Sequence, residues 1–496
     1  MAKIIRKKDK RQAGILMPLA SLPSNEGVGG MGAEAYKFVD LAVEMGFSIW
    51  QLLPLNPLGY GNSPYQPYSS FAGDEIYISL AALEKAGYLP EGFEPFAVTG
   101  DADRIDYVAA REYKEKYLRI ASRNFYAKDA GSEDFKAFVS QPWVRQYGAF
   151  LALKRQNGMR TWNEWPKAQR DWVLDGKYDI SHLEEEIDYR VFAQYMFIKQ
   201  WMKLKKYANS KKLKLMGDIP FYVGLDSQDV WASRENFLLN KDGHPDFIAG
   251  VPPDCFNSDG QRWGNPIYDW EYMEKDGFSF WLDRIGYTAD LYDIIRIDHF
   301  RAFDTYWKVP STCPTAKEGD WIEAPGSEFF NLLFEKRPKI EIVAEDLGGD
   351  FVPGVIALRK EFNLMGMNVA DFTLLSPQQP IKHQVIYTGT HDNQTVIGWY
   401  RSMKRSEQKK FRNALADYGT PRESVAKKML RYVFGSVSAM AIVPVGDILG
   451  LDDRGRINSP GTVGSPNWEW RMESYEPLEK KVGFIKDLLI ETQRAK

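Results

Sequence analysis

The chain has 496 residues, enough for two or more domains or for one large barrel with insertions. Its net charge of −3 gives no reason to expect binding to nucleic acid or to an anionic membrane surface. No run of about 18 apolar residues occurs, so we expect no membrane span. The two cysteines, Cys255 and Cys313, form neither a disulfide framework nor a metal-ligand pattern, which indicates a reducing compartment.

The N-terminus superficially resembles a secretory signal, because basic residues from Lys3 to Arg11 precede the apolar run Ala13–Leu22. Pro18 interrupts that run, and no small-x-small cleavage site follows it. We therefore expect a basic tail that leads into a first strand, and a cytoplasmic protein.

Eight short apolar runs, bounded by Pro, Gly or carboxylates, predict strands. They are Ala13–Leu19, Phe47–Leu55, Lys214–Phe221, Ile294–Phe300, Glu341–Leu347, Gly366–Phe372, Gln384–Thr390 and Ala439–Val445. Helical patterns lie between most of them, for example in Gly32–Gly46, residues 183–208 and Val355–Phe362. This alternation predicts a parallel sheet, and eight units favour one closed (β/α)8 TIM barrel over residues 1–496. An open doubly wound sheet is the alternative, although no Gly-x-Gly-x-x-Gly follows the first strand.

Two long segments interrupt the alternation, and we interpret them as insertions over about 56–182, after the second strand, and about 222–290, after the third. The first opens with the turn-rich stretch Gly59–Tyr68, whose tyrosines are candidates for a binding loop, and continues with helix-prone segments at 111–126 and 134–157. The second is loop-heavy. Its stretches Asn240–His244 and Asn257–Gly260 resemble calcium loops but lack the acidic ladder and the closing Glu, which favours turns.

Carboxylates stand at the ends of four predicted strands: Asp218, Asp298, Glu345 and Asp392. The carboxyl ends of barrel strands form one mouth, where barrel chemistry occurs, so these groups should converge. Each of them alone could be a helix cap or a member of a structural ion pair. Arg296 and Asp298, for example, lie on one face of a strand and could form such a pair. Four in register favour a functional site.

Two kinds of site fit several carboxylates in a barrel mouth. The first is a metal site, for which His299 and His391 could supply ligands. Barrel metal hydrolases often carry His-x-His on the first strand, however, and Ala13–Leu19 contains no histidine.

The second is glycosyl transfer by two carboxyl groups, of which one holds a proton and the other stays ionised. Arg296 beside Asp298 favours the charged form, which makes Asp298 the nucleophile. Glu345 follows an apolar run without an adjacent basic residue, so it is the better acid. Asp392 with His391 can bind vicinal hydroxyls and help to flatten the sugar ring.

Arg296-x-Asp298-His299, Glu345 and His391-Asp392 resemble the catalytic motifs of the α-amylase clan of retaining glycosidases. Over nearly its whole length the chain is more closely similar to the 4-α-glucanotransferase (amylomaltase, disproportionating enzyme) family. The stretches that carry this resemblance are Trp50-Gln-Leu-Leu-Pro-Leu-Asn-Pro, Ser63-Pro-Tyr-Gln, Gly217-Asp-Ile-Pro-Phe-Tyr, Asp226-Ser-Gln-Asp-Val-Trp, Gly260-Gln-Arg-Trp-Gly-Asn-Pro and Arg456-Ile-Asn-Ser-Pro-Gly-Thr.

The resemblance implies a (β/α)8 barrel with inserted subdomains and no separate C-terminal β-domain, and only about 50 residues follow the eighth predicted strand. It implies transfer of α-1,4-glucan segments from a maltooligosaccharide or a starch- or glycogen-derived donor to a sugar acceptor, without a cofactor or metal. The expected mechanism is a retaining double displacement through a covalent glucosyl-enzyme, with the two carboxyl groups roughly 5–5.5 Å apart.

The resemblance also implies a role for each site residue. Asp298 would be the nucleophile, Glu345 the acid/base and Asp392 the transition-state stabiliser. Arg296, His299 and His391 would surround the reacting glucose with Asp218 close by, Tyr65 would stack on the donor, Trp263 would cover the groove and Asn458 would line the acceptor side. An amylase-like α-glucan hydrolase with an open groove and a non-catalytic glucan-binding barrel remain the alternatives.

Overall fold

The computed structural model describes residues 11–98, 100–253, 258–346, 352–376 and 379–495. Cys255, Leu347, most of the basic tail and the start of the 257–260 stretch lie outside the described residues.

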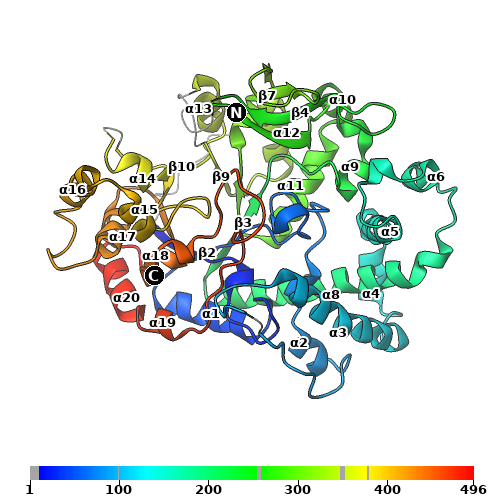
Figure 1. The fold of residues 1–496 in the computed structure, drawn as a ribbon, viewed down its shortest axis with the longest axis horizontal. Coiled ribbons are helices and arrows are strands. Elements are labelled where there is room, and N and C mark those ends of the chain that lie inside the picture. Colours follow the sequence, from blue (N-terminus) through cyan, green and yellow to red (C-terminus); the bar gives the residue numbers. More distant parts are fainter. Residues whose placement is uncertain (1–10, 99, 254–257, 347–351, 377–378, 496) are drawn as a thin grey trace.

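Eight parallel strands form the centre of the molecule, in the order β10-β11-β12-β1-β2-β3-β6-β9 (Figure 1). Their bounds are β1 Gln12–Leu16, β2 Ile49–Gln51, β3 Lys214–Ile219, β6 Ile294–Ile297, β9 Ile342–Ala344, β10 Gly366–Val369, β11 Gln384–Tyr387 and β12 Met440–Pro444. A parallel bridge joins Val343 to Met365, and the Ala344 N–H donates to the Met365 carbonyl at 2.8 Å, which brings the two edge strands together. The predicted (β/α)8 barrel is therefore confirmed, and the open sheet is excluded.

Every barrel strand ends earlier than its predicted run, and all of them except β1, which begins one residue early at Gln12, lie inside that run. β6 ends at Ile297, so Asp298 follows the last paired residue instead of lying within the strand. The second run, Phe47–Leu55, contributes only Ile49–Gln51. Strand pairing stops where the chain turns into the loops of the barrel mouth. Polar residues that follow the last paired positions, such as Asp298, can therefore point toward one another.

The barrel interior is filled by side chains from all eight strands. The buried cluster includes Leu16, Ile49, Met216, Ile294, Val343, Met367, Val385 and Ile442. This apolar cluster lies beneath the polar groups at the strand ends and supports them.

Helices separate successive strands, as the alternation predicts. They are α1 (Ala33–Glu44) before β2, α8 (Glu184–Ser210) before β3, α11 (Ser279–Leu291) before β6, α12 (Gly326–Lys336) before β9, α13 (Pro353–Glu361) before β10, α14 (Ala370–Thr373) before β11, and α15 (Val396–Ser402), α16 (Arg405–Ala414) and α17 (Val425–Gly435) before β12. After β12, residues 445–495 contain α18 (Val445–Leu449), α19 (Glu476–Glu479) and α20 (Val482–Glu491) and no strand. None of the helices in the described ranges is both long and apolar enough to cross a membrane.

Between β2 and β3, additional helices form a lobe on the right of Figure 1. They are α2 (Leu80–Lys85), α3 (Tyr107–Lys128), α4 (Glu133–Val139), α5 (Pro142–Gln156), α6 (Lys167–Arg170) and α7 (Trp172–Asp175). The helix-prone segment 134–157 is thus two helices. Pro142 explains the break, because proline fits the first turn of a helix but cannot continue a preceding one.

A second sheet, antiparallel and in the order β5-β4-β7-β8, lies above the barrel in Figure 1. Its strands are β4 (Phe247–Val251), β5 (Gln261–Pro266), β7 (Thr305–Pro310) and β8 (Asp320–Glu323), and α9 (Gln228–Ala232) and α10 (Trp270–Asp276) are close to it in the chain. The sequence interpretation missed this sheet. It described the insertion over about 222–290, which contains β4 and β5, as loop-heavy, and it expected no strands where β7 and β8 lie.

Candidate active site

A groove of about 690 Å³ lies at the carboxyl ends of the barrel strands. Seven of the ten residues proposed from the sequence line it: Tyr65, Trp263, Asp298, His299, His391, Asp392 and Asn458. The other three, Asp218, Arg296 and Glu345, lie directly beneath and contact the lining residues, so the structure brings all ten together.

Arg296 is the centre of this lower layer. Its guanidinium Nη1 donates to both oxygens of Asp218, at 2.7 and 2.6 Å, and its Nη2 lies 2.9 Å from Oδ1 of Asp298. The pairing of β3 with β6 places Asp218 opposite Arg296, and alternation places Asp298 on the same face. The Arg296 side chain is only 5% exposed, so one buried cation contacts two carboxylates.

Glu345 follows β9 and lies in different surroundings. Burial, and then the negative charge of Asp298, raise the pKa of Glu345 to about 8, although Arg296 and a hydrogen bond from the His299 backbone oppose the rise. The His299 N–H donates to Oε2 of Glu345 at 2.8 Å. At neutral pH this carboxyl group therefore carries a proton, whereas Asp298 is held in an ion pair.

His299 has a left-handed backbone conformation, with a φ of 53°, which is unusual for a residue with a side chain. This conformation accompanies the turn from β6 into the groove and the N–H bond to Glu345. Burial lowers the pKa of His299 to about 4, so the ring is neutral near pH 7. The Trp263 ring stands edge-on to it, with the centroids 4.8 Å apart.

On the other side of the groove, Tyr65 stacks on His391 with the ring centroids 4.9 Å apart and the planes 13° from parallel. The Tyr65 hydroxyl donates to Asp218 Oδ2 at 2.8 Å and lies 3.3 Å from Nδ1 of His391. Trp468 completes this cluster, with its ring 5.8 Å from each of the other two. A flat apolar surface with polar edges suits the face of a sugar ring.

Asp392 is positioned by residues from the chain after β12. Asn458 Nδ2 donates to Asp392 Oδ1 at 2.6 Å, and Nε2 of His391 lies 3.4 Å from the same oxygen. Arg456 donates from Nη2 to the Asp392 carbonyl at 3.2 Å and from Nε to the Asn458 carbonyl at 2.7 Å. The second carboxylate oxygen of Asp392 accepts none of these bonds, and the side chain is 43% exposed to the groove.

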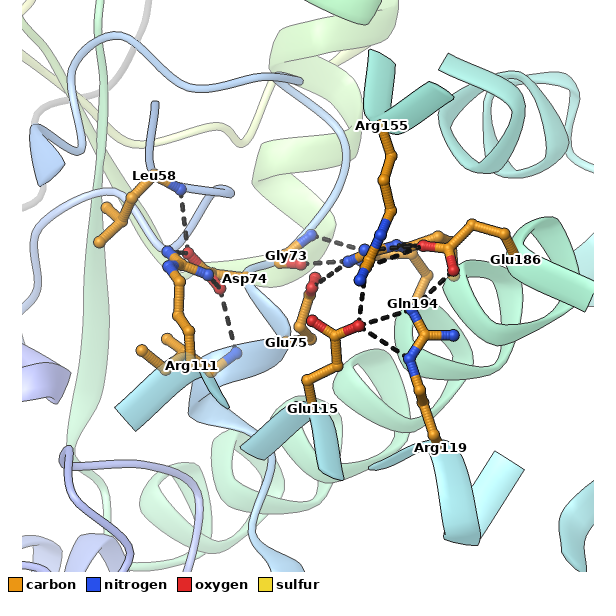
Figure 2. A network of polar contacts seen from close by, with 12 residues as sticks. Leu58, Gly73, Asp74, Glu75, Arg111, Glu115, Arg119, Arg155, Glu186 and Gln194 are labelled. Atoms are coloured by element: carbon orange, nitrogen blue, oxygen red, sulfur yellow. Dashed lines mark hydrogen bonds and ion pairs between the residues drawn. The ribbon is translucent and has the colours of Figure 1, made fainter. Parts of the chain in front are cut away.

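The loop that carries Tyr65 is closed at its base by Asp74, which is fully buried. Arg111 from α3 pairs with both oxygens of Asp74, at 3.0 and 2.7 Å, and the Leu58 N–H donates to the same carboxylate at 2.9 Å (Figure 2). Residues 58 and 74 are thereby joined across the whole loop, which fixes the ends of the segment that presents Tyr65.

Figure 2 also shows how this base is attached to the helical lobe. Gln194 of α8 accepts from the Gly73 N–H and donates to the Gly73 carbonyl, both at 2.8 Å. Further out, Glu115 accepts from Arg119 and Arg155 at 2.6–2.7 Å, which links α3 to α5. The lobe thus supports the groove wall on the Tyr65 side.

Four residues near the groove were not proposed from the sequence: Gln66, Tyr222, Arg456 and Trp468. Gln66, Tyr222 and Arg456 fall within stretches quoted for the family resemblance, but nothing in the sequence says which side chains face a groove. In the described ranges, no group of three or more His, Cys, Asp or Glu side chains is arranged to hold a metal ion.

Comparisons with known proteins identify the family. The model of glycoside hydrolase family 77, described as 4-alpha-glucanotransferase, matches residues 17–477. The chain is 39% identical over 480 residues to the 4-alpha-glucanotransferase of Streptococcus pneumoniae, covering 93% of each chain. It is also 39% identical over 489 residues to that of Thermus thermophilus, covering 93% of this chain and 95% of the relative.

A solved structure, the amylomaltase from Streptococcus agalactiae in complex with acarbose, matches with a TM-score of 0.93 at 34% identity, covering 98% of this chain and 100% of that one. The amylomaltase from Corynebacterium glutamicum, at 16% identity and a TM-score of 0.74, shares the fold. The chain therefore belongs to the 4-alpha-glucanotransferase family, whose members are transferases that act on α-1,4-glucans.

Proposed function

We propose that the chain transfers α-1,4-glucan segments between maltooligosaccharides by a retaining double displacement. Glu345 donates its proton to the glycosidic oxygen while Asp298 attacks the anomeric carbon and forms a β-linked glucosyl-enzyme. Glu345, now ionised, then takes the proton of the 4-hydroxyl of an acceptor sugar. That oxygen attacks the anomeric carbon, Asp298 leaves, and a new α-1,4 bond forms with net retention.

One observation carries this proposal: of two carboxyl groups at one barrel mouth, one is paired with a cation and the other is in surroundings that favour its protonated form. Arg296 pairs with Asp298 at 2.9 Å, whereas burial raises the pKa of Glu345 to about 8. The mechanism needs a charged nucleophile and a protonated acid at the same pH. We expect the two carboxyl groups to lie roughly 5–5.5 Å apart in the productive geometry.

We assign the remaining groove residues to binding. Asp392, whose side chain lines the groove, stabilises the positively charged transition state, and His299 and His391 bind sugar hydroxyls. Tyr65 stacks on the donor, Trp263 covers the groove, and Asn458 lies on the acceptor side. Asp218 and Arg296 hold this set from beneath.

The proposed donors are maltooligosaccharides and glucans derived from starch or glycogen, and the acceptors are sugars with a free 4-hydroxyl. The amylomaltase from Streptococcus agalactiae in complex with acarbose supports a sugar-like ligand for this groove. We also propose that residues 56–182 and 222–290 are insertions into one barrel, since both follow strands whose ends border the groove.

Incubation with maltotriose tests the activity. Transfer yields glucose together with oligosaccharides longer than the substrate, whereas an amylase-like hydrolase yields only glucose and maltose. A barrel that only binds glucan yields neither.

A fluoride donor tests the covalent step. In Glu345→Gln, α-maltosyl fluoride can still react, because fluoride leaves without a proton, but no base remains to activate the acceptor. We expect the maltosyl-enzyme to accumulate and peptide mass spectrometry to place the sugar on Asp298. An adduct on another residue would refute the assigned nucleophile.

A further inference from the structure

The loop that carries His391 and Asp392 leaves the barrel after β11 and enters α15 at Val396. Asp447, which follows the neighbouring strand β12, contacts both of its ends. Thr388 Oγ1 donates to Oδ2 of Asp447, and the Val396 N–H donates to Oδ1 at 2.8 Å. One carboxylate thus joins residues 388 and 396 across the loop.

This carboxylate is buried at considerable cost. Asp447 is 2% exposed, and Thr388 and Val396 are each 3% exposed. Burial raises the pKa of Asp447 to about 6, and the two groups that oppose the rise are the hydroxyl of Thr388 and the N–H of Val396, both uncharged. A position that served packing alone would favour an apolar side chain, because a buried carboxylate without a paired cation is destabilising.

Other contacts hold the middle of the loop. Asn393 Oδ1 accepts from the Thr390 N–H at 2.8 Å, and Asn393 Nδ2 donates to Asp371 at 2.9 Å. Asn458 donates to the Asp392 carboxylate itself at 2.6 Å. Asp447 adds to these contacts a direct link between the two ends of the loop, at Thr388 and Val396.

We propose that Asp447 is a positioning residue for the transfer reaction, which fixes both ends of loop 388–396 and so sets where Asp392 meets the reacting sugar. This inference rests on the proposed function, in which Asp392 stabilises the transition state. A displacement of about 1 Å in such a group can lower the rate about 100-fold. Asp447 itself does not line the groove.

Three variants separate positioning from charge. Asp447→Ala removes both bonds, so we expect kcat for maltotriose to fall about 10- to 100-fold with KM changed less than about threefold. Thr388→Val removes one bond at nearly constant volume and should lower kcat by an intermediate factor, even if the alanine variant does not fold. Asp447→Asn keeps an oxygen for the Val396 N–H and can donate to the Thr388 hydroxyl, so it should keep kcat within about threefold of the unmodified protein.

A double-mutant cycle provides the decisive readout. If Asp447 acts through Asp392, adding Asp447→Ala to Asp392→Asn should change the residual kcat by less than about twofold. A loss in the double variant as large as the loss in Asp447→Ala alone would overturn the positioning role, because general destabilisation would lower both backgrounds alike. If Asp392→Asn alone keeps full activity, the role of Asp392 in the proposed function fails, and the positioning role fails with it.

Discussion

The raised pKa of Glu345 makes a prediction about stability that is independent of any activity assay. In the folded protein this carboxyl group holds its proton to about pH 8, whereas in the unfolded chain it ionises near 4.5. Between these values the unfolded state binds fewer protons than the folded state, so the free energy of unfolding falls as pH rises. The Glu345→Gln variant removes this titration and keeps an oxygen that can accept the His299 N–H.

The magnitude follows from the interval between 4.5 and about 8, which at about 1.4 kcal/mol per pH unit amounts to about 5 kcal/mol. Solvent in the groove screens part of this energy. We therefore expect the free energy of unfolding of Glu345→Gln to exceed that of the unmodified protein by about 3 kcal/mol above pH 8 and by less than about 1 kcal/mol at pH 5. An unfolding entropy of about 2 cal/mol/K per residue gives about 1 kcal/mol/K for 496 residues. The expected gain in Tm is therefore about 3 °C at pH 8.5.

Scanning calorimetry of both proteins at about pH 5 and pH 8.5 measures this difference. Glu335→Gln, which changes an exposed carboxylate on α12, is the matched control and should follow the unmodified protein at both values. If the increase in Tm for Glu345→Gln is equal at the two pH values, or larger at pH 5, the reasoning that burial holds a proton on this group is refuted.

Three further predictions concern activity and the buried ion pairs. The value of kcat/KM for maltotriose should decline above about pH 8 as Glu345 loses its proton, and Glu345→Gln should lower kcat about 100- to 10,000-fold at every pH. Arg296→Met leaves Asp218 buried without its cation, so urea denaturation should show a loss of about 3–5 kcal/mol together with loss of transfer. Arg111→Met does the same to Asp74 at the base of the tyrosine loop, so it should lower stability by about 3–5 kcal/mol and raise KM more than it lowers kcat.

The exposed pair Lys37–Glu479 supplies the control for both arginine variants. Lys37→Met should change stability by less than about 1 kcal/mol and leave the kinetics unchanged, because exposed pairs contribute little. A loss for Arg111→Met that falls on kcat alone would contradict the assigned role of Asp74 in supporting donor binding.

The barrel could be predicted from the sequence because its strands are buried on both faces and read as short apolar runs. Ile294–Ile297 is an example: its apolar residues predict the strand, and Arg296 within it predicts a polar contact at the strand end. The second sheet could not be predicted in this way. β5 contains Gly264, Asn265 and Pro266, which are poor strand residues, and it forms a strand because it pairs with β4.

The site shows a similar division. Carboxylates at strand ends could be predicted from the sequence. The two-residue period of a strand gives the face on which they lie, and in a (β/α)8 barrel the carboxyl ends of the strands meet at one mouth. The partners that hold these carboxylates could not be predicted, because Tyr65 and Asp218 are 153 positions apart and Asn458 and Asp392 are 66 apart. Such contacts depend on how loops cross the barrel mouth, and no local pattern encodes that.

The charge arrangement beneath the groove connects the fold to the chemistry. A single guanidinium, Arg296, faces two carboxylates, Asp218 and Asp298, and among the described residues no second Lys or Arg forms an ion pair with either of them. Such an imbalance destabilises the resting protein, and an apolar pair on β3 and β6 would fold at lower cost. In the proposed mechanism, the oxocarbenium-like transition state supplies a positive charge near these carboxylates, and the excess negative charge then becomes favourable. A barrel whose parallel strands end together can hold the excess charge in place while its apolar interior, from Leu16 to Ile442, provides the stability.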